Sequence, residues 1–198
     1  MRSITYRKLF DCISDGKMTI KEGDYSYDEI IRSIPRIKLI KKLYNIEIVI
    51  LELEDRKINS LNDILLVFNI KDKKKRLNFI YDKMCDYLDL DFVVNNKCLF
   101  KNNKCVSDRN KSYNKNCGCC RAKSGELCKF LINNRCSIRN LGCKFFICPT
   151  LKKRGLKYRN RDFPIFNYFC SFREKIVLRY TIFVPKEKVI ERCLSHRW

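Results

Sequence analysis

The sequence predicts an α+β protein with a small mixed N-terminal region, an irregular cysteine-rich module and a short C-terminal strand and helix element. Apolar periodicity runs through the first half, disappears where cysteines become dense, and returns beyond Thr150. A chain of 198 residues is long enough for one domain with a core, or for a modest core plus a satellite held by other means. We expect a mixed α/β region at 1–96, a cysteine-cluster module at 97–150, and a basic link with a C-terminal element at 151–198 that packs on the rest.

Four elements are predicted in the first region. Residues 26–45 show helical spacing, with Ser26 or Asp28 near the start and Pro35 as a kink or break. The β-branched run IEIVILEL (46–53) has strand length, and Ser60 with Asp63 fits a capping box at the start of a short helix over 60–70. A third helix is expected over 72–90, with an apolar face that comprises Leu77, Ile80, Tyr81, Met84, Tyr87 and Leu88.

Several side chains of this first half are assigned structural roles. Met84 and Cys85 are predicted to be core residues rather than metal ligands, and lysines 73–75 to form the solvated first turn of the third helix. The carboxylates Glu52, Glu54 and Asp55 follow the apolar strand and indicate a strand exit rather than a paired acid and base.

No helix or strand pattern lasts ten residues between positions 98 and 150, so a large hydrophobic face cannot order this segment. Beyond it, the chain continues with an aromatic stretch, FPIFNYFCSF, and a β-branched run, KIVLRYTIFV, that predicts a strand over 175–184. The following PKEKVIERCLSH predicts a C-terminal helix with Pro185 at its first position.

Charge divides the chain near Asn96. Residues 1–97 carry 19 basic and 16 acidic side chains, a net +3, whereas residues 98–198 carry 24 and 6, a net +18. An AT-rich coding sequence, which favours Lys, Asn and Ile, is the alternative explanation without functional meaning. The N-terminus has no apolar run of signal-peptide type and no stretch approaches 18 apolar residues, so we expect a cytoplasmic protein that does not enter membranes.

The cysteines are the strongest functional signal. Disulfides do not persist in a reducing cytosol, so dense cysteines there indicate metal or redox chemistry. Histidine occurs once, as His196 near the terminus, and any metal is therefore bound by sulfur. Nine thiols within 51 residues could supply two four-thiolate sites with one to spare. The candidate ligands, which we call the cysteine array, are Cys98, Cys105, Cys117, Cys119, Cys120, Cys128, Cys136, Cys143 and Cys148.

The adjacent pair Cys119 and Cys120 limits the geometry, because neighbouring side chains diverge and seldom meet at one tetrahedral ion. They serve two sites or straddle a cluster. Cys117 is the least certain of the seven thiols between residues 117 and 149, and Cys98 or Cys105 are the alternatives for its place.

The segment GCC…CKFLINNRCSIRNLGCKFFICP resembles the YkgJ-type family of zinc- or iron-chelating cysteine-cluster proteins, whose cluster also occurs in flagellin lysine methylases. The matching elements are Cys119–Cys120, CKFL from Cys128, CSI from Cys136 and CKFF from Cys143. The beginning of the cluster departs from the family pattern, because the usual C-x2-C-x3-C-C becomes C-x-C-C. Through the stretches CDYLDLDFVVNNKCLFKNNKC (85–105) and FVPKEKVIERCL (183–194), the whole chain also resembles uncharacterised cysteine-rich proteins of clostridia-like bacteria.

The predicted metal is zinc, with two ions possible, or an iron–sulfur cluster, and three functions remain open for the protein that binds it. A fully thiolate-filled site is structural, and a cluster could also serve redox or iron sensing. The basic half suggests nucleic acid or an acidic protein as partner, because Lys and Arg neutralise phosphates and an exposed Tyr could stack on a base. Candidate contacts are Lys152, Lys153, Arg154, Lys157, Tyr158, Arg159 and Arg161. A redox or protein-modifying enzyme that uses the cluster is the third alternative, although no P-loop, G-x-G-x-x-G or H-E-x-x-H motif is present.

Overall fold

The computed structural model describes residues 2–94, 100–101, 104–105, 130–132 and 135–195. Its contacts divide into two compact units, one formed by Met1–Ile80 with Asn160–Ser171 and the other by Tyr81–Arg159 with Phe172–Trp198. The boundary expected near Asn96 lies outside the described residues. The first division between the two units lies within helix α4 (Lys73–Val94), an uninterrupted helix that has residues in both units.

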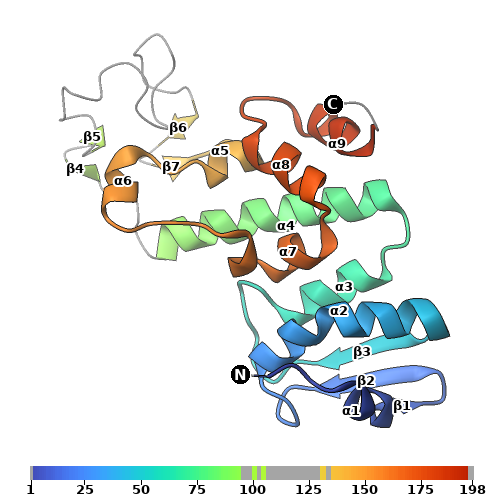
Figure 1. The fold of residues 1–198 in the computed structure, drawn as a ribbon. Coiled ribbons are helices and arrows are strands. Elements are labelled where there is room, and N and C mark those ends of the chain that lie inside the picture. Colours follow the sequence, from blue (N-terminus) through green and yellow to red (C-terminus); the bar gives the residue numbers. More distant parts are fainter. Residues whose placement is uncertain (1, 95–99, 102–103, 106–129, 133–134, 196–198) are drawn as a thin grey trace. The chain divides into compact units, whose positions relative to one another are not determined.

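A three-stranded sheet forms the base of the first unit (Figure 1). After helix α1 (Tyr6–Asp11), strand β1 (Ile13–Ser14) pairs antiparallel with β2 (Lys17–Lys21), and β2 pairs in parallel with β3 (Glu47–Leu51). The parallel pair is connected through helix α2 (Tyr27–Tyr44), as a crossover requires. Alternate strand residues enter the core, namely Met18, Ile20, Ile48 and Ile50.

Helix α2 confirms the predicted helix but not the predicted break. A capping box between Ser26 and Glu29 begins it, and Asn45 ends it in the left-handed conformation. The helix continues through Pro35, whose side chain is exposed. The carbonyl that loses its partner at a proline can bond to water when it faces solvent, so the helix persists at this position.

The strand and the other two helices predicted for the first half are confirmed, whereas the cap of the first of these helices is a bond from Asn62 to Ser60 rather than the predicted capping box. Strand β3 lies within the predicted run, and α3 (Leu61–Asn69) begins after Ser60, whose Oγ accepts the Asn62 N–H. All six apolar residues predicted on one face of α4, Met84 among them, are buried, as is Cys85. The first unit is completed by a 3-10 turn, η3 (Asn160–Asp162), and α7 (Pro164–Phe169), which packs on α2 and α3.

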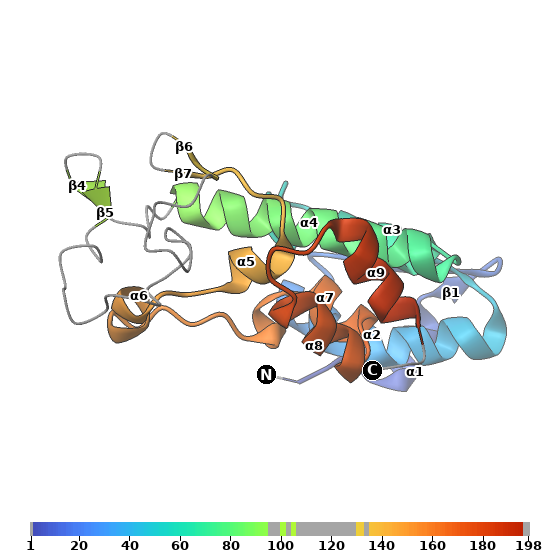
Figure 2. The same ribbon diagram turned by 90° about the horizontal axis from the view of Figure 1, so that it is seen from above.

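The second unit contains the later part of α4 and a series of short elements. Two small antiparallel pairs, β4 (Phe100–Lys101) with β5 (Lys104–Cys105) and β6 (Leu131–Ile132) with β7 (Arg135–Cys136), precede α5 (Leu141–Phe145) and α6 (Pro149–Lys153). Helix α5 packs against α8 (Phe172–Tyr180), and α8 packs against α9 (Lys186–Leu194), as Figure 2 shows. Between residues 98 and 150, the described elements are at most five residues long, which agrees with the missing periodicity.

The strand predicted over 175–184 is wrong. Residues 172–180 form helix α8, whose buried side chains Glu174 and Leu178 are four residues apart and therefore on one face. The β-branched run 175–184 covers both the end of this helix and the loop that follows it. Within the helix, tertiary packing outweighed the local preference of these residues for a strand. The C-terminal helix is confirmed as α9, with Pro185 as its N-cap rather than its first residue. None of the helices in the described ranges has the length and hydropathy that a bilayer crossing requires.

Candidate metal centre

The structure describes part of the cysteine array. Cys98, Cys117, Cys119, Cys120 and Cys128 lie outside the described residues, as does His196. The backbone of Cys105 belongs to β5. Cys136 ends β7 and is exposed, whereas Cys143 in α5 and Cys148 directly before α6 are buried. The described thiols of the array therefore belong to the second unit.

Helix α5, which carries Cys143, is fixed at its N-terminus by its own N-cap and by a tyrosine distant in sequence. The Cys143 N–H donates to Asn140 Oδ1 at 2.9 Å, and the Leu141 N–H donates to the Tyr81 hydroxyl oxygen at 3.1 Å. Asn140 also donates through Nδ2 to the Val184 carbonyl at 2.8 Å. These bonds satisfy helix-end N–H groups that would otherwise be buried without partners.

Close backbone packing fixes the other side of α5. A Cβ atom at Gly142 would lie 2.3 Å from the carbonyl oxygen of Thr181, in the loop between α8 and α9. Glycine is thus required sterically, because the two backbones approach more closely than any side chain permits. The position of Cys143 is set by α4 on one side and by the Thr181 loop on the other.

A row of aspartates on α4 neutralises basic residues of the second unit. Asp82, Asp86 and Asp89 recur at spacings of four and three, which place them on one helix face. The Lys186 ammonium lies 2.7 Å from Asp82, and the Arg139 guanidinium lies 2.8 Å from Asp86. The side chain of Lys144, which follows Cys143, is 3% exposed and forms an ion pair with Asp89.

These pairs change the interpretation of the basic half. Arg139 and Lys144 are interleaved with the cysteine array in the sequence, but their charges are engaged with α4. Part of the net charge of +18 is therefore neutralised within the fold and does not contribute fully to binding a polyanion. The spacing of the aspartates was visible in the sequence, whereas their partners, which lie more than 50 positions away, were not.

The thiol of Cys85 lies in the core, as predicted. Its side chain is inaccessible to solvent, and burial raises the pKa of the thiol to about 12, although the cations of Lys144 and Arg139 oppose that shift. A thiol with such a pKa stays protonated at neutral pH and behaves as an apolar side chain. Cys170 and Cys193 are also buried. The burial and the raised pKa of Cys85 favour a packing role for this thiol.

The charged side chains of the basic segment 152–159, which begins in the last turn of α6, are exposed, whereas its tyrosine is buried. Its exposed side chains are Lys152, Lys153, Arg154, Lys157 and Arg159. Tyr158 is only 6% exposed, and its hydroxyl donates to Asp91 at 2.5 Å. The expectation that Tyr158 is an exposed stacking residue is therefore wrong, because this hydrogen bond and two neighbouring rings hold it inside the unit. Arg161 is exposed but belongs to the first unit.

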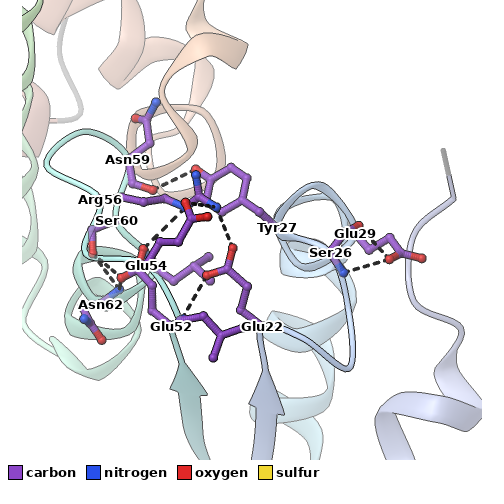
Figure 3. Close-up of polar contacts among 12 residues, drawn as sticks. Glu22, Ser26, Tyr27, Glu29, Glu52, Glu54, Arg56, Asn59, Ser60 and Asn62 are labelled. Atoms are coloured by element: carbon purple, nitrogen blue, oxygen red, sulfur yellow. Dashed lines mark hydrogen bonds and ion pairs between the residues drawn. The ribbon is translucent and has the colours of Figure 1, made fainter.

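The carboxylates that follow β3 have structural roles, as the sequence indicated (Figure 3). The side chain of Glu52 is 3% exposed and accepts hydrogen bonds from the Ser60 hydroxyl at 2.7 Å and the Leu61 N–H at 3.0 Å. It thereby caps the N-terminus of α3, where the helix dipole favours a negative charge. Glu54 is exposed and pairs with Arg56 at 3.3 Å. This arrangement supports a strand exit rather than an acid–base pair.

Within the described residues, no group of three or more His, Cys, Asp or Glu side chains is placed to hold a metal ion. Five thiols of the array and the side chain of Cys105 lie outside that search, and the soft sulfur donors that are described suit zinc and iron–sulfur clusters. No protein-family model, curated protein or solved structure matches the chain. The resemblance to the YkgJ-type family stays a prediction from the sequence.

Proposed function

We propose that the chain binds a metal through an all-thiolate site formed by the cysteine array, with zinc ahead of an iron–sulfur cluster. The observation that carries the proposal is the density of nine cysteines between Cys98 and Cys148 in a chain with one histidine. The structure adds support, because Cys143 lies on a helix held by Asn140, Tyr81 and the close contact at Gly142. A ligand on such a support is pre-positioned and loses little freedom on binding.

A structural role suits this site best. When thiolates fill every coordination position, no position remains open for a substrate. Zinc in small thiolate-rich peptides contributes on the order of 10 kcal/mol to folding at neutral pH. A contribution of that size would compensate for the scarcity of apolar residues with helical or strand periodicity between residues 98 and 150.

Metal analysis of the wild type and of single cysteine variants tests the proposal. The protein is purified anaerobically, and elemental analysis, a visible spectrum and thiol titration are recorded for the wild type, Cys143→Ser, Cys148→Ser and Cys12→Ser. We expect bound metal in the wild type and in Cys12→Ser, since Cys12 lies in the first unit, and a loss of metal in the other two. Less than half a metal per wild-type chain, with titration indicating disulfides, would refute the proposal.

Nucleic-acid binding is the second candidate function, favoured by the exposure of the five cations between residues 152 and 159. Lys and Arg side chains that contact phosphates release counterions, so the affinity would fall steeply with salt. Each tetrathiolate zinc would carry a charge of roughly −2, which leaves the 98–198 half strongly positive even with two ions bound. The absence of any complex at low salt in a gel-shift experiment would remove this candidate.

A further inference from the structure

The inward position of Tyr158 determines how its neighbours are presented. Its ring lies edge-on to Phe92 and Phe145, with centroids 6.0 and 6.5 Å away, and its hydroxyl is bonded to Asp91. Lys157 and Arg159, on either side of it, are both exposed. Tyr158 therefore acts as an anchor that directs the adjacent cations outward.

The same anchor holds the end of helix α8. Arg179 Nη2 donates to the Tyr158 carbonyl at 2.7 Å, and the guanidinium lies over the Phe145 ring at 4.9 Å from its centroid. The next residue, Tyr180, is the last of α8, and its side chain is 70% exposed. Consecutive Cα atoms are only about 3.8 Å apart. The backbone of Tyr180, which carries an exposed aromatic ring, is thus held one residue away from the arginine that donates to the basic segment.

We propose that this surface, formed by Tyr180 and the exposed cations between residues 152 and 159, binds single-stranded nucleic acid. Tyr180 stacks on an unpaired base, in the role that the sequence suggested for Tyr158, and the cations neutralise the adjacent phosphates. A duplex offers phosphates but keeps its bases stacked inside, so it would not use the ring. The proposal rests on the second candidate function and adds the class of nucleic acid and the stacking residue.

The aromatic part is tested with the full-length, metal-containing protein and a fluorescently labelled oligothymidylate of about 16 nucleotides, the upper end of the site sizes of single-strand-binding folds. Fluorescence anisotropy gives the Kd. We expect Tyr180→Ala to weaken binding at least about fivefold, the effect typical of one stacked base, and Tyr180→Phe to bind like the wild type. Phe172→Ala is the matched control, because Phe172 is 79% exposed at the opposite end of the same helix.

The cationic part is tested with two lysine pairs that undergo the same change of charge. Lys152→Glu/Lys157→Glu should weaken binding and reduce the slope of log Kd against log salt by about 0.7 for each phosphate that is no longer neutralised. Lys74→Glu/Lys75→Glu changes two exposed lysines of the first unit and should retain the wild-type slope. An equal weakening by both pairs would mean that only the net charge matters, and would overturn the proposal.

The remaining outcomes separate the inference from the function on which it rests. If the Lys152 and Lys157 pair weakens binding but Tyr180→Ala equals Phe172→Ala, or duplex of the same length binds as tightly as the single strand, nucleic-acid binding stands and the role of Tyr180 is refuted. If no nucleic acid binds at low salt while polyglutamate does, both are refuted in favour of an acidic protein partner. Circular dichroism of each variant verifies that its fold is intact.

Discussion

Gly142 shows how much the position of Cys143 depends on a single missing side chain. A Cβ at this residue would meet the backbone of Thr181 at 2.3 Å, and backbone cannot rotate away as a flexible side chain can. We expect Gly142→Ala to reduce the free energy of unfolding by about 3 kcal/mol, at the upper end of overpacking effects. Urea-induced unfolding measures the reduction.

Gly155→Ala is the matched comparison for that prediction. Gly155 has a positive φ of 84°, yet a Cβ there would meet nothing within 4 Å. Its substitution should therefore cost only the conformational strain, about 1 kcal/mol. Equal destabilisation by the two alanine variants would show that α5 and the Thr181 loop separate easily, which would contradict the tight support assigned to Cys143.

Glu22 provides a pH-dependent contribution in the first unit (Figure 3). The hydrogen bond from Arg56, at 2.6 Å, lowers the pKa of the Glu22 carboxyl below its ordinary value of 4.5. Its carboxylate therefore stabilises the fold above about pH 4.5, and that contribution disappears as the pH falls through the folded pKa. We expect Glu22→Gln to be less stable than the wild type at neutral pH and to lose less stability on acidification.

Thermal melts between about pH 3 and 7 test the Glu22 prediction. Glu54→Gln is the control, because Glu54 also pairs with Arg56 but is 73% exposed, where ion pairs contribute little. It should follow the wild-type curve. A parallel decrease of stability in the wild type and Glu22→Gln would assign the acid sensitivity to other carboxyl groups.

At the scale of elements, the aspartate row of α4 organises the second unit. Lys144 is buried to 3% exposure beside Asp89, so Asp89→Asn leaves a buried ammonium without its counter-charge. Because Asp89 itself is 43% exposed, we expect a destabilisation of about 2 kcal/mol, below that of a fully buried pair. Asp86→Asn, one turn earlier, removes an exposed pair with Arg139 and should cost less than about 1 kcal/mol. Chemical denaturation measures the free energy of unfolding of both variants. A loss for Asp86→Asn as large as that for Asp89→Asn would contradict this ranking.

The same elements show what the sequence could and could not predict. Helices α2, α3, α4 and α9 and strand β3 were predictable, because their apolar spacing and caps lie within each segment. Helix α8 was missed, because its packing on α5 and α9 outweighed the β-branched pair of Ile176 and Val177. The candidate donors of the proposed metal site were visible as cysteines, but the support of α5 was not. That support joins Leu141 to Tyr81 and Asn140 to Val184, across 60 and 44 positions, and no local pattern encodes such pairs.

At the scale of the whole molecule, the two compact units have different reasons to be stable. The described part of the first unit has a sheet and long helices whose apolar faces form a core. The described elements of the second unit are mostly short, and all the thiols of the array belong to that unit by their position in the chain. If the array binds a metal, the metal adds stability to the second unit, which carries every thiol of the array in addition to its own buried apolar residues, and the first unit does not depend on it.

Removal of the metal should therefore loosen one unit selectively. Hydrogen exchange is followed by mass spectrometry before and after treatment with an organomercurial and a chelator under reducing conditions. We expect faster exchange in α5. Without a bound ion at the array thiols, the bonds to Tyr81 and Asn140 would be among the restraints that remain on this helix, and it would open more often. Amides of the β2–β3 pair in the first unit are bonded within the sheet and should keep their protection. Unchanged exchange in α5 would show that this helix does not depend on a bound metal. An equal increase of exchange in β2 and β3 would show that the two units unfold together.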